Sequence, residues 1–258
     1  MVTQDYDIQI LPILNDNFIF IIIHRSTNNI CVVDPGEPEK LIFEIQKNSW
    51  NLKQIWITHH HQDHTGGLEK LKNIFNPQIF ANLKDQNRVS LATNYLNEDG
   101  EFGFESLKIK TISLDGHTLG HFGFYVPELK SLFSGDVIFS LGCGRLFEGS
   151  YEQLYSSLNK IKNLPDSTLI YFAHEYTIKN YQFTKSIDSD NVLLERYIHD
   201  VQARLSLQIP SVPTTLGEQK KINLFLRLDD NNVKSKLNMI SSSELKILKK
   251  LRELRNEF

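Results

Sequence analysis

Short apolar runs rich in β-branched and aromatic residues alternate with polar turns along the first two-thirds of the chain. Asparagine-rich turns separate the runs Ile8–Leu14, Phe18–Ile23 and Ile30–Val33, a pattern that predicts strands joined by hairpins. Strands joined by intervening helices are typical of sheet layers that helices cover. Further strands are expected at 54–58, 107–112, 122–126, 131–134 and 168–172.

Apolar residues at helical spacing indicate helices between and after these strands. One helix is predicted over Pro38–Asn48 and another from Gly67 to Phe75. The pattern changes after about His174, where a long helix is predicted over Asn191–Leu207. Strand signals end there, so we expect the C-terminal part of the chain to be helical.

A proline-containing loop and a last helix are predicted near the C-terminus. The loop Ile209–Thr215 contains two prolines and cannot continue a helix. Ser241 and Glu244 have the spacing of a capping box, followed by leucines down one face of a last helix.

The C-terminal part of the chain also carries an excess of positive charge. From Gly217 onward there are ten Lys and Arg residues and six Asp and Glu residues, a local charge of +4. This asymmetry indicates that the helical tail meets an anionic partner.

Composition excludes several classes of protein. With 258 residues, of which 40% are hydrophobic and 23% charged, the chain has the profile of a soluble globular protein. Its net charge of −3 argues against a chain that binds nucleic acid over its whole surface, and we expect no nucleic-acid partner. The apolar run Phe18–Ile23 is far shorter than the roughly 20 residues that span a bilayer. Asp5 and Asp7 near the start make a secretory signal unexpected. The chain has only Cys31 and Cys143 as cysteines, which suits a reducing compartment, so we expect a cytoplasmic location without membrane association.

Four histidines and one aspartate occupy the six positions from His59 to His64, where an apolar strand runs into a loop. In an extended segment alternate side chains share a face, so His59 and His61 can point the same way while His60 points back. Asp63 and His64 follow the turn. Imidazole suits zinc or iron, and carboxylate suits a hard divalent ion. The segment therefore predicts a metal site.

Three further residues of the same chemistry follow at predicted strand ends, namely His117, Asp136 and His174. Loops of a layered α/β fold converge at such ends. Each residue alone would more often be structural. A purely structural metal is the other interpretation of the histidine cluster, but structural zinc sites are usually rich in cysteine and neither cysteine is near the cluster. The pattern favours catalysis.

The chain resembles a known family along its whole length. The string HxHxDH followed by Gly-Gly, with a later His, Asp and His, is similar to the metallo-β-lactamase superfamily of binuclear metallohydrolases. Within it the chain resembles the hydroxyacylglutathione hydrolases (glyoxalase II). The supporting segments are LNDNFIFII at 14–22, THHHQDHTGG at 58–67, GHTLGH at 116–121, SGDVIFSLGCGRLFEG at 134–149, AHEYTIKN at 173–180, TTLGEQKKINLFLR at 214–227 and LRELRNEF at 251–258.

The resemblance implies an α+β fold, the αββα sandwich of the metallo-β-lactamases followed by helices. It implies a catalytic domain over residues 1–175 and a helical glutathione-binding domain over residues 176–258. It also implies two divalent metal ions per chain, zinc first, with iron and manganese as alternatives. We expect the protein to be a monomer.

The resemblance also implies metal ligands. One ion would be held by His59, His61 and His117, the second by Asp63, His64 and His174, and both by Asp136. Asp63 and Asp136 would be the catalytic residues, with Asp63 also accepting a hydrogen bond from the nucleophile. His60 and His121 fall at motif positions that are not ligands in the family.

Glutathione recognition would use the Cys-Gly-Arg loop, the Tyr of HEYT and the basic C-terminal helix. The implied residues are Arg145, Phe147, Tyr176, Arg252 and Arg255. Phe147 stands where family members often carry Tyr, which removes one hydroxyl donor, and Arg255 replaces a common Lys with its charge kept. A solvated helix face is the alternative interpretation of Arg252 and Arg255.

The implied reaction is hydrolysis of the thioester S-D-lactoylglutathione to D-lactate and glutathione by a metal-bridging hydroxide, a step of methylglyoxal detoxification. Three alternatives stay open. A mononuclear-iron persulfide dioxygenase acting on glutathione persulfide would need fewer of these ligands. A phosphodiesterase or tRNA-processing nuclease would need a basic stripe with aromatics, which is absent outside the tail. A metal-bound, non-catalytic binder of glutathione conjugates would hold metal without turnover.

Overall fold

A computed structural model of the chain describes residues 2–258. Its contacts divide the chain into two compact units. The first unit comprises Met1–Ser113 and Leu119–Gly135, and the second comprises Leu114–Thr118 and Asp136–Phe258. None of the described helices is long and apolar enough to cross a membrane.

The first unit contains a six-stranded sheet in which each strand neighbours the next one along the chain. The first three strands pair antiparallel, and the pairs from the third strand onward are parallel. The first hairpin is in full register, from Tyr6 opposite His24 to Ile13 opposite Asn17. The strands are β1 (Tyr6–Ile13), β2 (Asn17–His24), β3 (Asn29–Val33), β4 (Asn51–Trp56), β5 (Gln78–Asn82) and β6 (Asn94–Leu96).

Helices connect two of the three parallel pairs of this sheet, since parallel strands need a crossover connection. Helix α1 (Glu39–Asn48) lies between β3 and β4, and α2 (Gln62–Thr65) and α3 (Leu68–Phe75) lie between β4 and β5. Four further strands of this unit follow as antiparallel neighbours in chain order. They are β7 (Glu101–Phe104), β8 (Leu107–Ser113), β9 (Phe122–Val126) and β10 (Ser131–Gly135). Short 3-10 turns occur at Val2–Asp5, Leu83–Asp85 and Pro127–Leu129.

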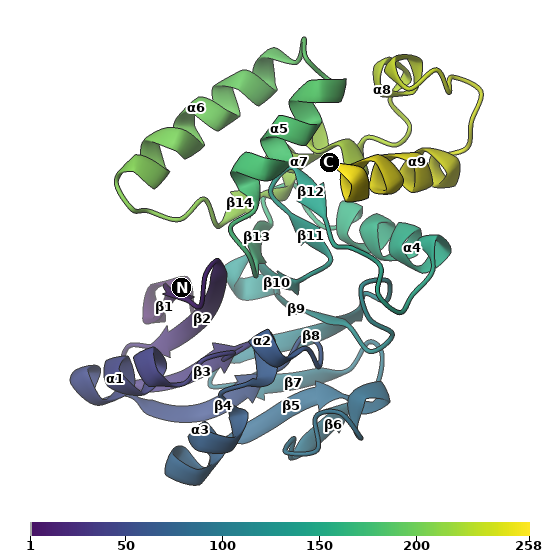
Figure 1. Cartoon of the computed structure of the whole chain (residues 1–258). Helices are drawn as coiled ribbons and strands as arrows, with labels where there is room; N and C mark the ends of the chain where they lie inside the picture. The colour runs from purple at the N-terminus through teal and green to yellow at the C-terminus, as the bar shows by residue number, and fades with distance from the viewer. Residues whose placement is uncertain (1) are drawn as a thin grey trace. The chain divides into compact units, whose positions relative to one another are not determined.

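The six-stranded sheet is buried on both faces. On one face its isoleucines pack with leucines of α1 and α3, which Figure 1 shows against the same side of the sheet. On the other face aromatic rings meet the β7–β10 strands: Trp56 lies 5.6 Å from Phe124 and Phe80 lies 4.2 Å from Phe102, measured between ring centroids. This unit is therefore built from a helical layer and two sheet layers.

The second unit is mostly helical, with two short strand pairs. Helix α4 begins with a capping box between Ser150 and Gln153. Helix α9 buries Ile247, Leu248 and Leu251. The strands are β11 (Ile138–Phe139), β12 (Gly142–Cys143), β13 (Leu169–Phe172) and β14 (Thr214–Thr215), and the helices are α4 (Tyr151–Lys162), α5 (Thr177–Ile187), α6 (Val192–Ser206), α7 (Leu216–Ile222), α8 (Asn231–Lys236), α9 (Glu244–Glu257) and a 3-10 turn at Leu224–Leu226.

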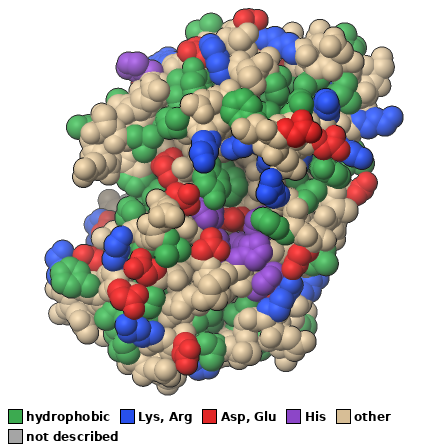
Figure 2. Space-filling view, viewed as in Figure 1, with side chains coloured by type: hydrophobic (Ala, Val, Ile, Leu, Met, Phe, Trp, Pro, Cys, Tyr) green, Lys and Arg blue, Asp and Glu red, His purple; other side chains and the backbone are tan. Residues whose placement is uncertain are grey.

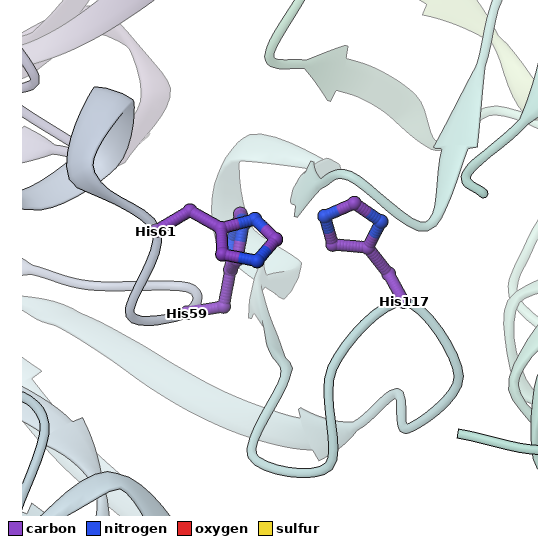
Figure 3. A group of neighbouring side chains, drawn as sticks. All are labelled: His59, His61 and His117. Atoms are coloured by element: carbon purple, nitrogen blue, oxygen red, sulfur yellow. The ribbon is translucent and has the colours of Figure 1, made fainter. Parts of the chain in front are cut away.

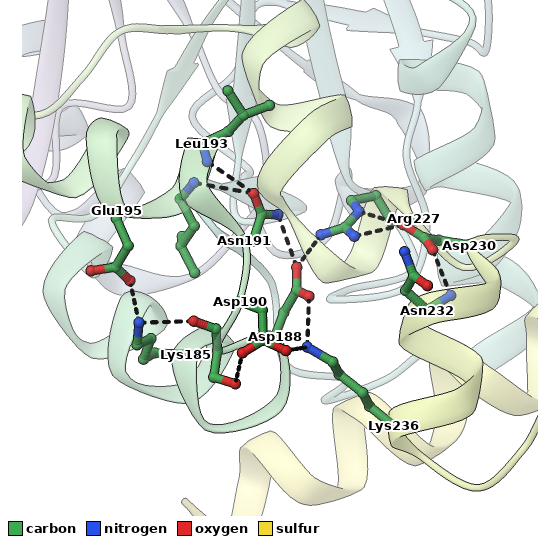
Figure 4. A network of polar contacts seen from close by, with 12 residues as sticks. Lys185, Asp188, Asp190, Asn191, Leu193, Glu195, Arg227, Asp230, Asn232 and Lys236 are labelled. Carbon is green, nitrogen blue, oxygen red and sulfur yellow. Dashed lines mark hydrogen bonds and ion pairs between the residues drawn. The ribbon is translucent and has the colours of Figure 1, made fainter.

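A partly buried ion-pair network, centred on the buried Asp188, joins the end of α5 to α8 (Figure 4). The Arg227 guanidinium donates to Asp188 at 2.5 Å and to Asp230 at 2.6 and 3.0 Å. Asn191 donates to Asp188 at 2.9 Å, and Lys236 lies 3.5 Å from the same carboxylate. Burial alone would raise the pKa of Asp188, but the hydrogen bonds from Arg227 and Asn191 outweigh it and hold that pKa below its ordinary value.

Most of the predicted elements are present, with small shifts at their ends. The strand predicted at 54–58 lies earlier, as Asn51–Trp56, because the chain leaves the sheet before the histidine segment. The C-terminal region is helical as expected, except that the segment 209–215, expected as a loop, contains the short strand β14. One prediction is wrong. Ser241 and Glu244 form no capping box, because Ser243 occupies the N-cap of α9 and makes no side-chain cap bond.

Candidate metal centre and substrate site

The histidine-rich segment leaves the sheet after β4 and enters α2. His59 and His61 lie side by side, with Nε2 of the first 3.0 Å from Nδ1 of the second. The His60 ring turns to another partner, its Nδ1 lying 3.6 Å from the Asp85 carboxylate. The alternation expected of an extended segment is therefore present, and two imidazoles are presented together.

A buried carboxylate holds the last histidine of the segment. Nδ1 of His64 lies 2.9 Å from Oδ2 of Asp34, and both side chains are buried. The same carboxylate accepts hydrogen bonds from the backbone N–H of Thr58 at 2.8 Å and from its hydroxyl at 2.6 Å. A carboxylate at Nδ1 favours the imidazole proton there, so Nε2 is the nitrogen of His64 that could bind a metal ion.

Asp63 is oriented from the hairpin at the start of the chain. Asn17, the first residue of β2, donates from Nδ2 to Oδ2 of Asp63 at 2.9 Å. The turn before α1 packs closely on the Asp63 backbone, since a Cβ at Gly36 would lie 1.8 Å from its carbonyl oxygen. Only glycine fits this approach.

In the second unit one carboxylate faces two histidines. Oδ2 of Asp136 lies 3.5 Å from Nε2 of His117 and 3.3 Å from Nε2 of His174. The other ring nitrogen of His117 lies 2.7 Å from the backbone carbonyl of Arg145, which directs Nε2 toward the carboxylate. The loop is tight here, because a Cβ at Gly144 would lie 1.9 Å from the Asp136 carbonyl oxygen.

Three groups of side chains could each hold a metal ion, because one ligand atom from every member lies within 4.8 Å of the others. Figure 3 labels the three histidines of the first group, of which His59 and His61 lie side by side, and Figure 2 shows histidine side chains on one face of the molecule. The first group contains the three residues that the resemblance assigns to one ion, and the third contains the three that it assigns to the second ion. Asp136, which the resemblance assigns to both ions, is in neither of these two groups. The groups are His59, His61 and His117; His59, His64 and Asp136; and Asp63, His64 and His174.

The donor atoms fit divalent metal ions. Two nitrogens that each lie about 2.1 Å from one tetrahedral zinc ion are about 3.4 Å apart, and the ring nitrogens of His59 and His61 lie close to that separation, at 3.0 Å. Imidazole and carboxylate are the donors that zinc, iron and manganese accept.

The residues expected to bind glutathione lie in the second unit. The Tyr176 ring stacks on His174, with 4.8 Å between centroids and 7° between planes. Phe147 is 62% exposed, and its ring centroid lies 5.1 Å from that of His117. Arg145 is an exposed side chain of the same loop. Tyr176 and Phe147 thus each contact a histidine of the implied ligand sets.

The two arginines of α9 are not a solvated helix face. Arg252 is buried and donates from Nη1 to the Cys143 carbonyl at 2.7 Å, and its guanidinium lies 5.6 Å from the Phe225 ring centroid. Arg255 is half-buried and lies over Phe183 at 5.9 Å. Burial, and then the charge of Arg252, lower the pKa of Arg255 from its ordinary value.

Several residues that shape these sites were not foreseen from the sequence. Asp34 and Asn17 orient His64 and Asp63 from 30 and 46 positions away along the chain. Asn180 and Asn256 contact the arginines that are expected to bind the substrate. The only local signals are that Asp34 ends an apolar strand before Pro-Gly and that Asn180 closes the AHEYTIKN segment.

Comparison with known proteins decides the family. A family model described as the metallo-beta-lactamase superfamily matches residues 16–174, and one described as the hydroxyacylglutathione hydrolase C-terminus matches residues 175–258. A hydroxyacylglutathione hydrolase of Vibrio campbellii is 41% identical over 254 residues, covering 98% of this chain and 99% of the relative. The chain belongs to the hydroxyacylglutathione hydrolase family. It is therefore a metal-dependent hydrolase.

Further relatives agree with this membership. A hydroxyacylglutathione hydrolase of Bdellovibrio bacteriovorus is 40% identical over 231 residues, covering 86% of this chain and 92% of the relative. Among solved structures, a metallo-beta-lactamase from Staphylococcus aureus has a TM-score of 0.66 at 18% identity, covering 96% of this chain and 72% of that one. The structural likeness shows the metallo-β-lactamase fold, and the predicted α+β class is confirmed.

Proposed function

We propose that the chain hydrolyses S-D-lactoylglutathione to D-lactate and glutathione, and so takes part in methylglyoxal detoxification. The observation that carries the proposal is the set of histidine and aspartate ligand atoms gathered within 4.8 Å in a chain of the hydroxyacylglutathione hydrolase family. The glutathione half of the substrate carries two carboxylates. The arginines of the second unit supply charges of the opposite sign.

We assign His59, His61 and His117 to one ion, Asp63, His64 and His174 to a second, and Asp136 to both. The assignment is supported by Oδ2 of Asp136, which faces Nε2 of His117 and Nε2 of His174 at 3.5 and 3.3 Å. Two bound divalent ions, zinc in our proposal, would lower the pKa of a water to about 7 and stabilise negative charge on the thioester oxygen.

The chain's own residues would prepare this chemistry by holding each ligand in one orientation. Asp34 holds the proton on Nδ1 of His64, so that Nε2 stays a ligand atom. Asn17 donates a hydrogen bond to Oδ2 of Asp63 and so orients this carboxylate, which in our proposal accepts a hydrogen bond from the nucleophile. The leaving group needs no strong acid, because a thiol with a pKa of about 8.5 can depart as a thiolate.

We propose that residues 1–175 form the catalytic domain and residues 176–258 the glutathione-binding domain. Arg145, Arg252 and Arg255 would bind the carboxylates of glutathione, while Tyr176 and Phe147 would contact its peptide. Burial of Arg252 supports this role, since a charge is rarely buried without a functional or structural partner.

We also propose that the enzyme works as a monomer in a reducing, cytoplasmic compartment. Cys31 and Cys143 are both free and buried, which suits such a compartment. Burial raises the pKa of the Cys143 thiol to about 11 and keeps it in its unreactive form.

The proposal is tested by comparing two thioesters of D-lactate. S-D-lactoylglutathione carries both glutathione carboxylates, and S-D-lactoyl-N-acetylcysteamine has the same reacting group without them. We expect kcat/KM to be at least about 100-fold higher for the glutathione thioester, which corresponds to two charge-assisted contacts. Equal values for the two substrates, or no hydrolysis of either, would overturn the proposal.

A further inference from the structure

The three arginines of the substrate site are oriented by neutral oxygens rather than by carboxylates. Arg145 and Arg252 both donate from Nε to Oδ1 of Asn256, at 3.4 and 3.2 Å. Arg255 donates from Nε and Nη2 to Oδ1 of Asn180, at 3.3 and 3.2 Å. Over residues 2–258 the structure shows no ion pair between these guanidinium groups and any carboxylate.

Arg227, in the same unit, is instead paired with carboxylates, as buried arginines usually are. Its guanidinium is also largely buried, and it is neutralised by Asp188 at 2.5 Å and Asp230 at 2.6 Å. Buried charges are usually paired in this way. The three substrate-site arginines instead keep their charge close to one another, so they form a concentrated positive potential.

Asn180 is fixed so that its oxygen faces Arg255. The side chain is buried, and its Nδ2 donates to the Ser140 carbonyl at 2.9 Å. A Cβ at Gly142 would lie 2.5 Å from Nδ2, so the amide has little space to turn. With Nδ2 committed to the Ser140 carbonyl, Oδ1 is the atom left for the guanidinium.

Asn256 links the loop arginine to the helix arginine. Its single Oδ1 accepts from Arg145 and from Arg252, which lie 107 positions apart in the sequence. Nη1 of Arg252 also donates to the Cys143 carbonyl, so the guanidinium is held from two sides. Asn256 itself is exposed, so a substitution there removes little packing.

We propose that Asn180 and Asn256 are positioning residues of a dianion-binding site: they orient the three guanidinium groups while leaving their charge available to a ligand with two carboxylates. The proposal deepens the proposed function and rests on it for the identity of the ligand. An aspartate at either position would orient the same guanidinium more strongly but would neutralise it. The affinity for the dianion should then fall, while the thermal stability of the protein should stay the same or rise.

The test replaces each amide by its isosteric acid, in Asn180→Asp and Asn256→Asp. Asn231→Asp, on exposed α8, adds the same charge outside the site and is the matched control. Asn256→Gln keeps a neutral oxygen. Binding of S-methylglutathione, a non-hydrolysable probe, is measured by calorimetry on the metal-loaded enzyme at two salt concentrations, together with KM, kcat and the thermal midpoint.

We expect Kd and KM to rise about tenfold in both aspartate variants, with kcat within twofold and the thermal midpoint unchanged or higher. The dependence of Kd on salt should weaken, because one positive charge is lost to an internal pair. Asn256→Gln and Asn231→Asp should stay within about threefold of the wild type. Should Asn180→Asp not fold, the exposed position 256 carries the test alone.

Unchanged Kd in Asn256→Asp, or a loss of affinity matched by a fall in thermal midpoint, would overturn the inference. The proposed function fails separately. A wild type that binds S-methylglutathione without hydrolysing S-D-lactoylglutathione would refute the reaction but leave the positioning role in place. If the wild type hydrolyses the thioester and the aspartate variants have the same Kd and KM as the wild type, the proposed reaction stands and the positioning role is refuted.

Discussion

Oδ2 of Asp34 lies 2.9 Å from Nδ1 of His64, and the same carboxylate accepts two hydrogen bonds from Thr58. This contact ties the end of β3 to the segment after β4. Because it fixes the tautomer of His64, its effect should appear in metal binding before it appears in the fold.

Asp34→Asn should weaken metal binding about 10- to 100-fold, since an amide holds the imidazole proton less firmly than a carboxylate. Metal content after dialysis against a graded chelator series measures the change. Asp7→Asn is the matched control, because Asp7 pairs with Arg25 at an exposed position. Unaltered chelator resistance in Asp34→Asn would show that the carboxylate does not act through the metal.

Asp136→Asn should lower metal content and kcat together, because the amide cannot offer a negative charge to two ions. Elemental analysis and turnover of S-D-lactoylglutathione are measured on one preparation. Asp166→Asn, at a side chain that is 72% exposed, should change neither quantity. Full metal occupancy with near-normal turnover in Asp136→Asn would contradict the shared-ligand assignment.

Arg252→Ala should raise KM about tenfold or more while kcat falls less than threefold, because in the proposed role the guanidinium binds a part of the substrate distant from the reacting carbonyl. Steady-state kinetics measure the split. Lys249→Ala, at an exposed position of the same helix, is the control. The thermal midpoint must be recorded as well, since Arg252 is buried. A large fall in kcat at constant KM would refute the binding role.

Asp188→Asn should destabilise the second unit by about 3 kcal/mol, because it leaves the buried Arg227 with one carboxylate instead of two. Urea unfolding at pH 7 measures the loss, with Asp229→Asn as the exposed control. The pKa of Asp188 is lowered in the folded protein. Its contribution is therefore present above the unfolded pKa of about 3.9 and is lost as the pH falls through the folded value.

At pH 3 the wild type and Asp188→Asn should consequently differ less in stability than at pH 7. An equal difference at the two pH values would mean that the ion pair does not stabilise this unit. The comparison needs no substrate and no metal, so it is independent of the proposed reaction.

Elements whose patterning is local could be predicted from the sequence. Alternating or continuous apolar runs gave β1 to β3 to within two residues of their ends, because hairpin register depends on neighbouring residues. β14 was missed because two threonines between prolines and a helix carry no strand pattern of their own. They become a strand only by pairing with Leu169 and Ile170.

The same difference between local and long-range contacts applies to the residues of the candidate site. The histidine segment could be recognised because its candidate ligands are adjacent in sequence. Four other residues could not be recognised, because each contacts a residue that is 30 to 111 positions away in the sequence and that only the fold brings close. They are Asp34, Asn17, Asn180 and Asn256. Asparagine and aspartate are common in turns, so their identity alone indicates no function.

The most direct test of the account is metal removal and reloading, followed at the thioester absorbance of S-D-lactoylglutathione. The chelated enzyme should lose hydrolysis, and Zn²⁺ should restore it in proportion to occupancy, reaching full rate at about two ions per chain. Hydrolysis that survives complete metal removal, or full activity with no bound ion, would contradict the central claim that the His59–His64 segment and Asp136 form a catalytic metal centre.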